Sequence, residues 1–389
     1  MNSYEVLNAI REIRVKRLYG WLNNIPQPPV KITMFITQKC NLKCIFCGVP
    51  KCIKEGKFDF SRELPTEKWL DVVKEGIELG VVDWEMLGVG EALLRSDVVV
   101  NTIKLIKENS KISYFLLTTN GTLFTKEIIE EIVKAGLDRI QFSIDGPDAK
   151  THDYLRGVKG TFERAIWALR NITKMKRELK TENPALSINM VLNAKNYNKV
   201  NKMIKLAHKV GVEEIIITPM RIEKDNAERV EKHKLIMDSK EIEKFYKLTE
   251  KYLKSAEKNK IRLQVLLTKG KEKIIGPTDD IIEDDIQNKF LTSPCYEPFY
   301  NLAITPTGEV GPCVTSASFG IRNLNVMQKS LKDIWHSKEF NEIREKRINR
   351  TPLPQCSHCT ITELRRQIRN ELLEYLKEKN EYERFVVKK

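Results

Sequence analysis

Three closely spaced cysteines are the residues of this chain best suited to carry chemistry. Cys40, Cys44 and Cys47 are separated by three and then by two residues, and they directly follow the apolar run 31–37. Soft thiolate ligands select iron-sulfur clusters, zinc or copper over hard cations. Three thiolates at this spacing can hold one iron-sulfur cube, but they leave one iron without a protein ligand. Structural zinc prefers four protein ligands in closely spaced pairs, so the spacing favours a cluster with one open iron over a zinc loop or a chance grouping.

A second group of cysteines lies near the C-terminus. Cys295, Cys313, Cys356 and Cys359 are separated by 17, 42 and 2 residues. Four thiolates can ligate a whole cube. They can equally complete a zinc site, for which the close pair Cys356 and Cys359 is suitable. The spacing of this group alone leaves both metals open.

The composition indicates a globular protein of the reducing cytoplasm. The chain has 389 residues, of which 41% are hydrophobic and 31% charged, which is enough for one large domain and a smaller one. No stretch approaches the roughly 18 consecutive apolar residues of a membrane span, and the N-terminus has no signal-peptide core. Eight cysteines without a secretory signal indicate metal ligation or redox chemistry rather than a disulfide framework.

The charge is strongly positive. The formal net charge of +14 arises from 67 Lys and Arg against 53 Asp and Glu, and such an excess favours an anionic substrate, an acidic redox protein or RNA as a partner. The excess is spread over Lys-rich helices, which is typical of a solvated surface. No stacking aromatic residues interleave the Lys runs, as single-strand binding would require. A zinc-stabilised RNA-binding protein is therefore the non-enzymatic alternative, and nucleic acid is not the expected partner.

Regular alternation of apolar runs and amphipathic patterns predicts the elements that position the cysteines. Expected strands are 31–37, 83–88, 113–118, 138–144, 187–193 and 214–218, and expected helices are 65–79, 97–109, 125–135, 160–178 and 198–210. Thr125 and Asn198 are expected N-caps, with Gly136 and Gly211 after the helix ends. Repeated strand-helix units imply a parallel sheet, doubly wound or closed toward a barrel, in which chemistry lies at the carboxyl ends of the strands. The cysteine loop leaves the first strand at that end.

The flanking segments complete the expected organisation. Residues 1–29 form an amphipathic helix and a Pro-rich linker, and 30–222 form the strand-helix repeats. Residues 223–290 are a mainly helical connector rich in Lys, Glu and Ile, and 291–362 are a small second domain. Residues 363–389 are a charged helix.

The cysteine loop resembles that of the radical S-adenosylmethionine (radical SAM) enzymes. Phe46 stands immediately before Cys47, as the aromatic residue of the family's loop does, and is expected at the cofactor site. The resemblance implies a 4Fe-4S cluster whose open iron is held by the amine and carboxylate of SAM. It also implies an α/β fold, a partial (β/α)6 TIM-like barrel with a small C-terminal α+β auxiliary-cluster domain.

Residues 88–92 follow the second expected strand and resemble the family's Gly-Gly-Glu-Pro segment. Val89 and Ala92 depart from the family's Gly and Pro, whereas Gly90 and Glu91 are kept. The resemblance implies that Gly90 and Glu91 hold the methionine ammonium of SAM.

Later strand ends imply further SAM contacts by the same resemblance. Asn120 lies in the segment 118–121 after the third strand. Ser143, after the fourth strand, and the downstream Arg156 are expected at the SAM ribose and carboxylate, because an Arg fork suits a carboxylate. Leu192, at the end of the fifth strand, is expected either to meet the adenine through its backbone or to be a core residue.

The second cysteine group lies within segments that resemble the auxiliary-cluster domains called SPASM and, in their shorter form, twitch. These segments are 300–313 and 331–335. Four cysteines instead of the seven of a full SPASM domain favour the twitch form with one second 4Fe-4S cluster. The spacing is similar to that of twitch enzymes that dehydrogenate alcohols on aminocyclitols. In a chain that also has a radical SAM loop, an iron-sulfur cluster is favoured over zinc at the second cysteine group, because a second redox centre can accept an electron from the reaction.

The resemblance implies a radical SAM oxidoreductase. Such an enzyme cleaves SAM reductively to a 5'-deoxyadenosyl radical, which abstracts hydrogen from a C–H bond of the substrate. We expect the substrate to be a small molecule, anionic or sugar-like. We expect the auxiliary cluster to accept the electron from the substrate radical. A ferredoxin or flavodoxin is the expected electron donor.

Two other enzymatic functions would use the same domains. A peptide- or protein-modifying enzyme would be recognised by a leader-binding winged-helix segment before the barrel, for which residues 1–30 are short. A redox-neutral epimerase would need a hydrogen-atom donor, for which Cys52, five residues after the loop, is the candidate. The simpler interpretation of Cys52 is an inert, partly buried thiol.

Overall fold

The structure is a computed structural model that describes residues 3–266, 288–292, 295–314, 323–349, 351, 356 and 362–385. Among the described helices, none combines the length and the apolar composition that a membrane span requires.

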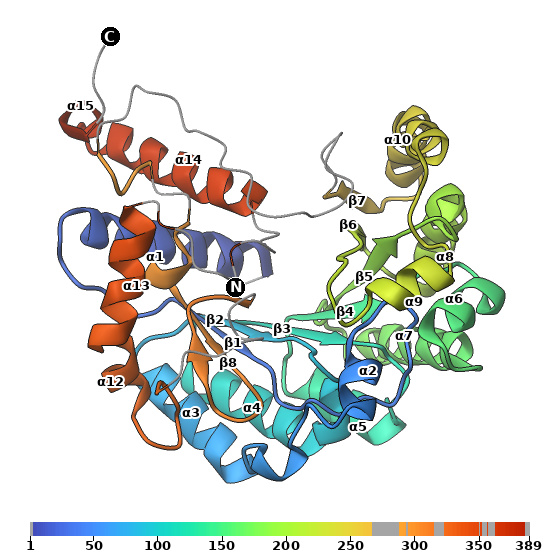
Figure 1. The fold of residues 1–389 in the computed structure, drawn as a ribbon, viewed down its shortest axis with the longest axis horizontal. Coiled ribbons are helices and arrows are strands. Elements are labelled where there is room, and N and C mark those ends of the chain that lie inside the picture. The colour runs from blue at the N-terminus through green and yellow to red at the C-terminus, as the bar shows by residue number, and fades with distance from the viewer. Residues whose placement is uncertain are drawn as a thin grey trace.

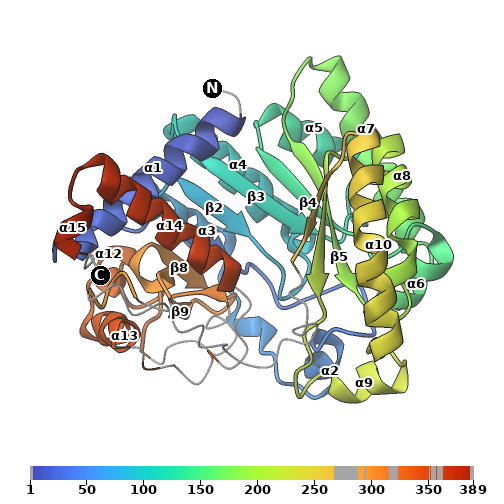
Figure 2. The same ribbon diagram turned by 90° about the horizontal axis from the view of Figure 1, so that it is seen from above.

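One curved sheet runs through the molecule (Figures 1 and 2). Over the described residues it has nine strands in the order β7-β6-β5-β4-β3-β2-β1-β8-β9. Neighbouring strands are parallel except for β8 and β9, which are antiparallel. The strands are β1 (Lys31–Met34), β2 (Asp83–Met86), β3 (Tyr114–Thr119), β4 (Arg139–Ser143), β5 (Ala185–Leu192), β6 (Glu214–Pro219), β7 (Arg262–Val265), β8 (Asn301–Ile304) and β9 (Val310–Gly311). The sheet therefore forms part of a barrel without closing, as the predicted fold class required.

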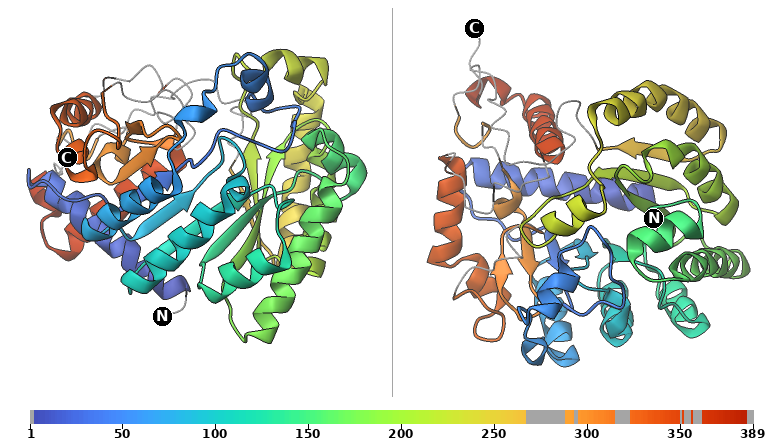
Figure 3. Two further views of the ribbon diagram at one scale, coloured as in Figure 1. Left: turned by 90° about the horizontal axis from the view of Figure 1, so that it is seen from below. Right: turned by 45° about the vertical axis from the view of Figure 1, so that its right-hand side comes forward.

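The long helices that connect successive strands from β1 to β6 cover the outer face of this sheet (Figure 3), whereas the first helix lies on its other side. The helices are α1 (Ser3–Leu22), α2 (Val49–Lys54), α3 (Thr66–Glu78), α4 (Ser96–Asn109), α5 (Lys126–Lys134), α6 (Ala149–Arg156), α7 (Thr161–Glu178), α8 (Val200–Val210), α9 (Ala227–Lys232), α10 (Ser239–Lys258), α12 (Leu331–Trp335), α13 (Lys338–Ile348), α14 (Thr362–Glu378) and α15 (Tyr382–Phe385), with 3-10 turns η1 (Phe60–Arg62), η2 (Ala92–Arg95), η3 (Tyr197–Lys199) and η4 (Glu297–Phe299).

Alternation along the strands separates the two faces of the sheet. On β4, Ile140 and Phe142 are buried in the core beneath the helices, whereas Gln141 and Ser143 point to the concave side and are half-buried. Buried aromatic side chains such as Trp69 on α3 and Trp84 on β2 fill the space between helices and sheet. The main core therefore lies outside the curve. On the inside, Tyr114 and Leu116 of β3 belong to a second apolar cluster with α1, whereas polar side chains such as Gln141 lie nearer the carboxyl ends of the strands.

The six expected strands and five expected helices of the repeats are all present. Thr125 caps α5, since its hydroxyl accepts a hydrogen bond from the Ile128 amide at 3.2 Å, and Gly211 ends α8 with a φ of +79°. The expectation that Asn198 caps α8 is wrong, because residues Tyr197–Lys199 form η3 and Lys199 precedes the helix without a side-chain cap. The Asn196 side chain instead stabilises this turn by accepting from the Asn193 amide at 2.8 Å.

The sheet extends beyond the six expected strands at both edges. β7, within the connector that was expected to be mainly helical, pairs in parallel with β6 from Glu214↔Arg262 onward. At the other edge β8 pairs in parallel with β1, from Lys31↔Asn301 to Met34↔Ile304. The strand pair β8 and β9 that precedes Cys313 is thereby joined, through β8, to the strand that leads into the Cys40 loop.

Candidate active site

The three loop cysteines lie between β1 and α2, at the carboxyl edge of the sheet. Cys44 is buried, and Cys40 and Cys47 are half-buried. Burial raises the pKa of Cys40 to about 11, and the neighbouring Cys44 adds to this shift. Burial also raises the pKa of Cys47 to about 12, with further contributions from Cys44 and Cys40. The thiols are therefore close enough to interact with one another.

Residues 88–91 bring the end of β2 against this loop. The Gly90 amide donates to the Thr37 carbonyl at 3.1 Å, and the Glu91 amide donates to the Lys39 carbonyl at 2.8 Å. A Cβ on Gly90 would lie 2.0 Å from the Lys39 oxygen. Glycine at position 90 is thus required by the close approach of the cysteine loop itself.

The carboxylate of Glu91 joins the ends of β2 and β3. It is 3% exposed, and it accepts hydrogen bonds from the Thr119 hydroxyl at 2.5 Å and the Asn120 amide at 2.7 Å. Burial raises the pKa of Glu91, while these hydrogen bonds and the charge of Arg156 oppose the shift. The Asn120 side chain in turn donates to Asn41 of the loop at 2.9 Å. Glu91 and Asn120 therefore position the loop as well as the strand ends.

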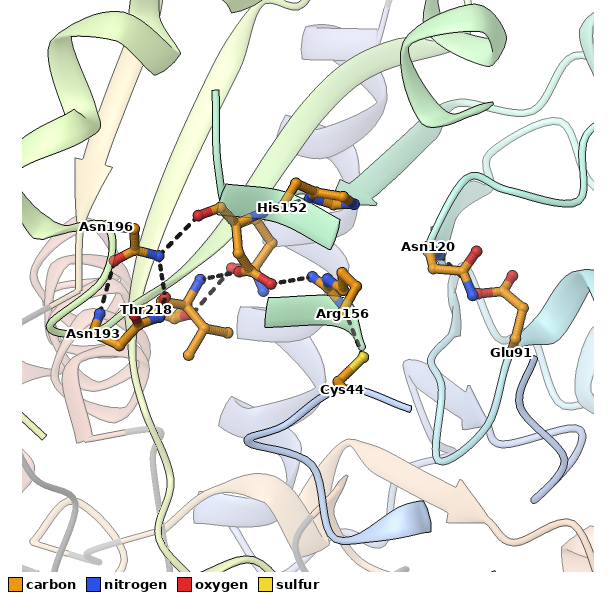
Figure 4. A network of polar contacts seen from close by, with 11 residues as sticks. Cys44, Glu91, Asn120, His152, Arg156, Asn193, Asn196 and Thr218 are labelled. Atoms are coloured by element: carbon orange, nitrogen blue, oxygen red, sulfur yellow. Dashed lines mark hydrogen bonds and ion pairs between the residues drawn. The ribbon is translucent and has the colours of Figure 1, made fainter. Parts of the chain in front are cut away.

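Arg156, at the end of α6, contacts the loop from the other side (Figure 4). Its Nη1 lies 3.7 Å from the Cys44 sulfur, its Nη2 lies 2.7 Å from the Asp145 carboxylate, and its guanidinium carbon lies 5.5 Å from the centre of the Phe46 ring. Burial raises the pKa of Cys44, and the guanidinium of Arg156 opposes the rise only in part. The pKa of Cys44 is raised on balance, so the guanidinium would stabilise the thiolate only once a metal ion binds the sulfur.

Asp145 is a residue of the site to which the sequence assigned no role. Its side chain is fully buried, and besides pairing with Arg156 it accepts from the Val191 amide at 2.8 Å. Burial raises the pKa of the Asp145 carboxyl, whereas Arg156 opposes the rise. Its position directly after β4 and before Gly146 could have indicated this role, because functional residues in parallel sheets lie at the carboxyl ends of the strands.

The two remaining expected SAM contacts lie further along the sheet edge. Ser143 ends β4 opposite Asn189 of β5 and is half-buried on the concave side. Leu192 ends β5, and its side chain is 5% exposed within the main core. Only the backbone of Leu192 is thus left to contact a ligand.

Cys52 lies on α2, the helix that directly follows the cysteine loop. Burial raises the pKa of its thiol, and a hydrogen bond with the Asp225 carboxylate adds to the shift. Asp225 also accepts a hydrogen bond from Lys57 at 2.6 Å. A protonated thiol is the form that a hydrogen-atom donor needs, so this role of Cys52 stays a prediction.

The second cysteine group is described in part, since Cys359 lies outside the described residues. Cys295 is buried just before η4, and Cys313 is half-buried just after β9. Cys356 lies 3.5 Å from Nη1 of Arg347, which is 5% exposed.

No three His, Cys, Asp or Glu side chains in the described part of the chain are grouped as ligands of one metal ion. In an iron-sulfur cube each cysteine binds a different iron, so the sulfurs are spaced more widely than around a single ion. Three mutually interacting thiols on one loop, with Arg156 beside Cys44, fit three corners of a cube. The donor set therefore suits the cluster that the loop spacing predicted.

Polar side chains line the concave face of the sheet near the same edge. Thr118 donates to Gln141 at 3.3 Å, and Thr218 donates to Asn189 at 3.2 Å. These four residues, the concave polar row, are half-buried on β3 to β6. Hydroxyls and amides both donate and accept hydrogen bonds, so the row is suited to a polar substrate.

Comparison with known protein families gives two matches that together include both cysteine groups. The model of the radical SAM superfamily matches residues 34–207. The SPASM model, described as an iron-sulfur cluster-binding domain, matches residues 295–360. The first match contains the loop cysteines with Glu91, Asn120 and Arg156.

Individual relatives were found by sequence and by structure. The PqqA peptide cyclase of Rhizobium meliloti (strain 1021) is 28% identical over 82% of this chain and 76% of its own length. The PqqA peptide cyclase of Methylocella silvestris is 26% identical over 84% of this chain and 80% of its own. The structure of Streptococcus suis SuiB bound to precursor peptide SuiA has a TM-score of 0.60 and 18% identity, over 88% of this chain and 72% of SuiB. The likeness to SuiB establishes a shared fold.

Proposed function

Because the chain is a radical SAM enzyme with a SPASM-type iron-sulfur cluster-binding domain, we propose that its substrate is a peptide or a protein. The observation that carries this proposal is the similarity to PqqA peptide cyclases over more than four fifths of the chain. These relatives favour the peptide-modifying alternative over the small, sugar-like substrate that the cysteine spacing suggested.

The chain's own residues would hold the cofactors as follows. Cys40, Cys44 and Cys47 ligate the first cluster, and Glu91 at the end of β2 holds the ammonium of SAM. Ser143 and Arg156 contact its ribose and carboxylate, and Arg156 also supports the loop through Cys44. When bound, the cluster and SAM would provide the chemistry that removes a hydrogen atom from an unactivated C–H bond.

The concave polar row would bind the substrate. Its hydroxyl and amide groups match the alternating donors and acceptors of a peptide backbone. Its first residue, Thr118, lies on β3, whose end contacts the cysteine loop through Asn120. A bound peptide segment would therefore place a side chain near the carboxyl edge of the sheet, where radical chemistry is generated.

The second cysteine group supports a net oxidation. Four cysteine ligands leave a cluster no open iron for substrate, so we assign to Cys295, Cys313, Cys356 and Cys359 a cluster that accepts the substrate electron. A reduced ferredoxin or flavodoxin would supply the electron that starts the reaction. An epimerase using Cys52 as hydrogen donor is the competing outcome.

The test compares substrate classes on anaerobically reconstituted, dithionite-reduced protein with SAM. A pool of short peptides should stimulate release of 5'-deoxyadenosine over the substrate-free rate, and the modified peptide should lack two hydrogen atoms by mass spectrometry. A variant with Cys40, Cys44 and Cys47 replaced by Ala is the control and should release nothing. Stimulation by aminocyclitols and not by peptides would restore the small-molecule function. Solvent deuterium on an otherwise unchanged peptide would identify an epimerase.

A further inference from the structure

A segment after β6 holds the cysteine loop through its main chain. Arg229 of α9 donates from Nη1 to the Cys47 carbonyl at 3.1 Å, and from Nη2 to the carbonyls of Lys43 and Cys44 at 3.0 and 2.9 Å. One guanidinium thus contacts three carbonyl oxygens of the loop. Two of these belong to cysteines proposed as cluster ligands.

Asn226 adds a fourth contact from the residue that precedes α9. Its Nδ2 donates to the Phe46 carbonyl at 2.8 Å and to the Arg221 carbonyl at 2.9 Å. Its Oδ1 accepts from the Glu223 amide at 2.7 Å. Asn226 is 6% exposed, so it is itself rigidly placed by its own turn.

Apolar packing fixes α9 against the same loop. Val230, the residue after Arg229, is fully buried in a small cluster with Ile45 of the loop and Leu155 of α6. On the α6 side, the loop amides of Lys43 and Ile45 donate to the carbonyls of Arg156 and Leu155 at 3.2 and 2.9 Å. The loop is therefore held between α6 and α9.

We propose that Arg229 is a positioning residue for the cluster, which fixes the turn between Cys44 and Cys47 and adds positive charge behind it. A planar guanidinium with several donors can bind three carbonyls at once, whereas an ammonium on a flexible stem cannot hold the same geometry. Positive charge near an iron-sulfur cluster stabilises its reduced form. The inference rests on the proposed cluster role of the three cysteines and is independent of the substrate class.

The first test measures the conformation of the loop in the full-length chain before reconstitution. Arg229→Gln and Arg229→Lys are compared with Lys232→Gln, which removes an exposed charge from the same helix. Hydrogen-deuterium exchange of the peptide that contains the Lys43, Ile45 and Cys47 amides should be about tenfold faster in both Arg229 variants. Exchange in α5 and in the Lys232→Gln variant should match wild type. Loop exchange within twofold of wild type, or an equal rise in α5, would overturn the proposal.

The second test measures the reduction potential of the first cluster after reconstitution, followed by its SAM-sensitive electron paramagnetic resonance signal. Arg229→Gln should shift the potential to more negative values, because a positive charge is lost. Arg229→Lys keeps the charge and should stay near wild type despite its faster loop exchange. An unshifted potential in Arg229→Gln would remove the electrostatic part of the proposal. Neither result depends on whether peptides are substrates.

Discussion

At the scale of single residues, buried carboxylates connect neighbouring strand ends. Glu91 connects β2 to β3 through Thr119 and the Asn120 amide, and Asp145 connects β4 to β5 through the Val191 amide. A carboxylate can accept about four hydrogen bonds, so contacts within the chain still leave Glu91 an acceptor for the SAM ammonium. These residues therefore serve both the position of the strand ends and the proposed cofactor.

Glu91→Gln separates the charge of this residue from its volume. The amide keeps the size of the side chain but loses the charge-assisted hydrogen bond to the ammonium. We expect SAM affinity to fall by tenfold or more, with iron and sulfide content unchanged, as measured by anaerobic binding titration and metal analysis.

Asp138→Asn is the matched control for the Glu91 variant. Asp138 is also a buried carboxylate, and it accepts from the Phe115 amide at 2.7 Å at the start of β3, the opposite edge from the cysteine loop. Its replacement should lower stability but leave SAM affinity unchanged. Wild-type SAM affinity in Glu91→Gln would show that the ammonium is held elsewhere.

At the scale of elements, the first and the last long helices support the second cysteine group. The helices α1 and α14 lie side by side (Figures 1 and 2). Buried Ile10 and Leu18 of α1 and Leu372 of α14 pack in one cluster with Tyr296 and Phe299, next to Cys295. Leu7 of α1 lies outside this cluster and is 41% exposed. Loss of the contact between these two helices should therefore destabilise the region around Cys295 more than it destabilises the barrel.

Glu371→Ala tests the helix pair. Glu371 is 5% exposed and pairs with Arg14 at 2.6 Å and with Arg11 at 3.3 Å. Removing it leaves the guanidinium of Arg14, whose side chain is 15% exposed, without this carboxylate, which should cost about 3 kcal/mol in the free energy of unfolding. The measurement is urea denaturation followed by circular dichroism.

Glu374→Ala is the control for the helix pair. Its carboxylate pairs with Arg11 at 3.1 Å, but its side chain is 63% exposed. Exposed ion pairs contribute about 0 to 1 kcal/mol, so this variant should unfold close to wild type. Equal losses in the two variants would show that burial of the Arg14 pair does not stabilise the docking.

At the scale of the whole molecule, one pair of strands joins the two metal-binding regions. β1 leads into the Cys40 loop, and its neighbour β8 lies between Cys295 and Cys313. Parallel pairing of β1 with β8 along four residues fixes the position of one region relative to the other. Cluster content of the two regions should nevertheless be separable, because their ligands lie on different segments.

Metal analysis tests this separation. Anaerobic reconstitution should give about eight iron and eight sulfide per chain if each cysteine group holds one cube. Replacing Cys40, Cys44 and Cys47 together by Ala should leave about half. Stoichiometric zinc in anaerobically purified wild type would instead assign the second cysteine group to zinc.

Local patterns were sufficient to predict most of the barrel and several residues that lie around the cysteine loop. Strand and helix periodicity is a property of short windows, and the loop cysteines, Glu91, Asn120 and Arg156 each lie in or just after a recognisable segment. The structure brings these residues together, as their order at successive strand ends predicted. Asn198 was misassigned because local hydrogen bonds of Asn196 formed a 3-10 turn before the helix.

Contacts between distant segments were decided by the tertiary structure alone. β8 pairs with β1 across about 270 residues, and Arg229 reaches the Cys47 carbonyl from 182 residues away. Neither contact can be predicted from the local sequence, because backbone carbonyls and strand edges have the same chemistry in every segment. Arg229 lies in the connector 223–290, for which the sequence alone predicts mainly helix and no contact with the cysteine loop. Packing of Val230 against Ile45 and Leu155, together with the hydrogen bond from Asn226 to the Phe46 carbonyl, places it at the cysteine loop.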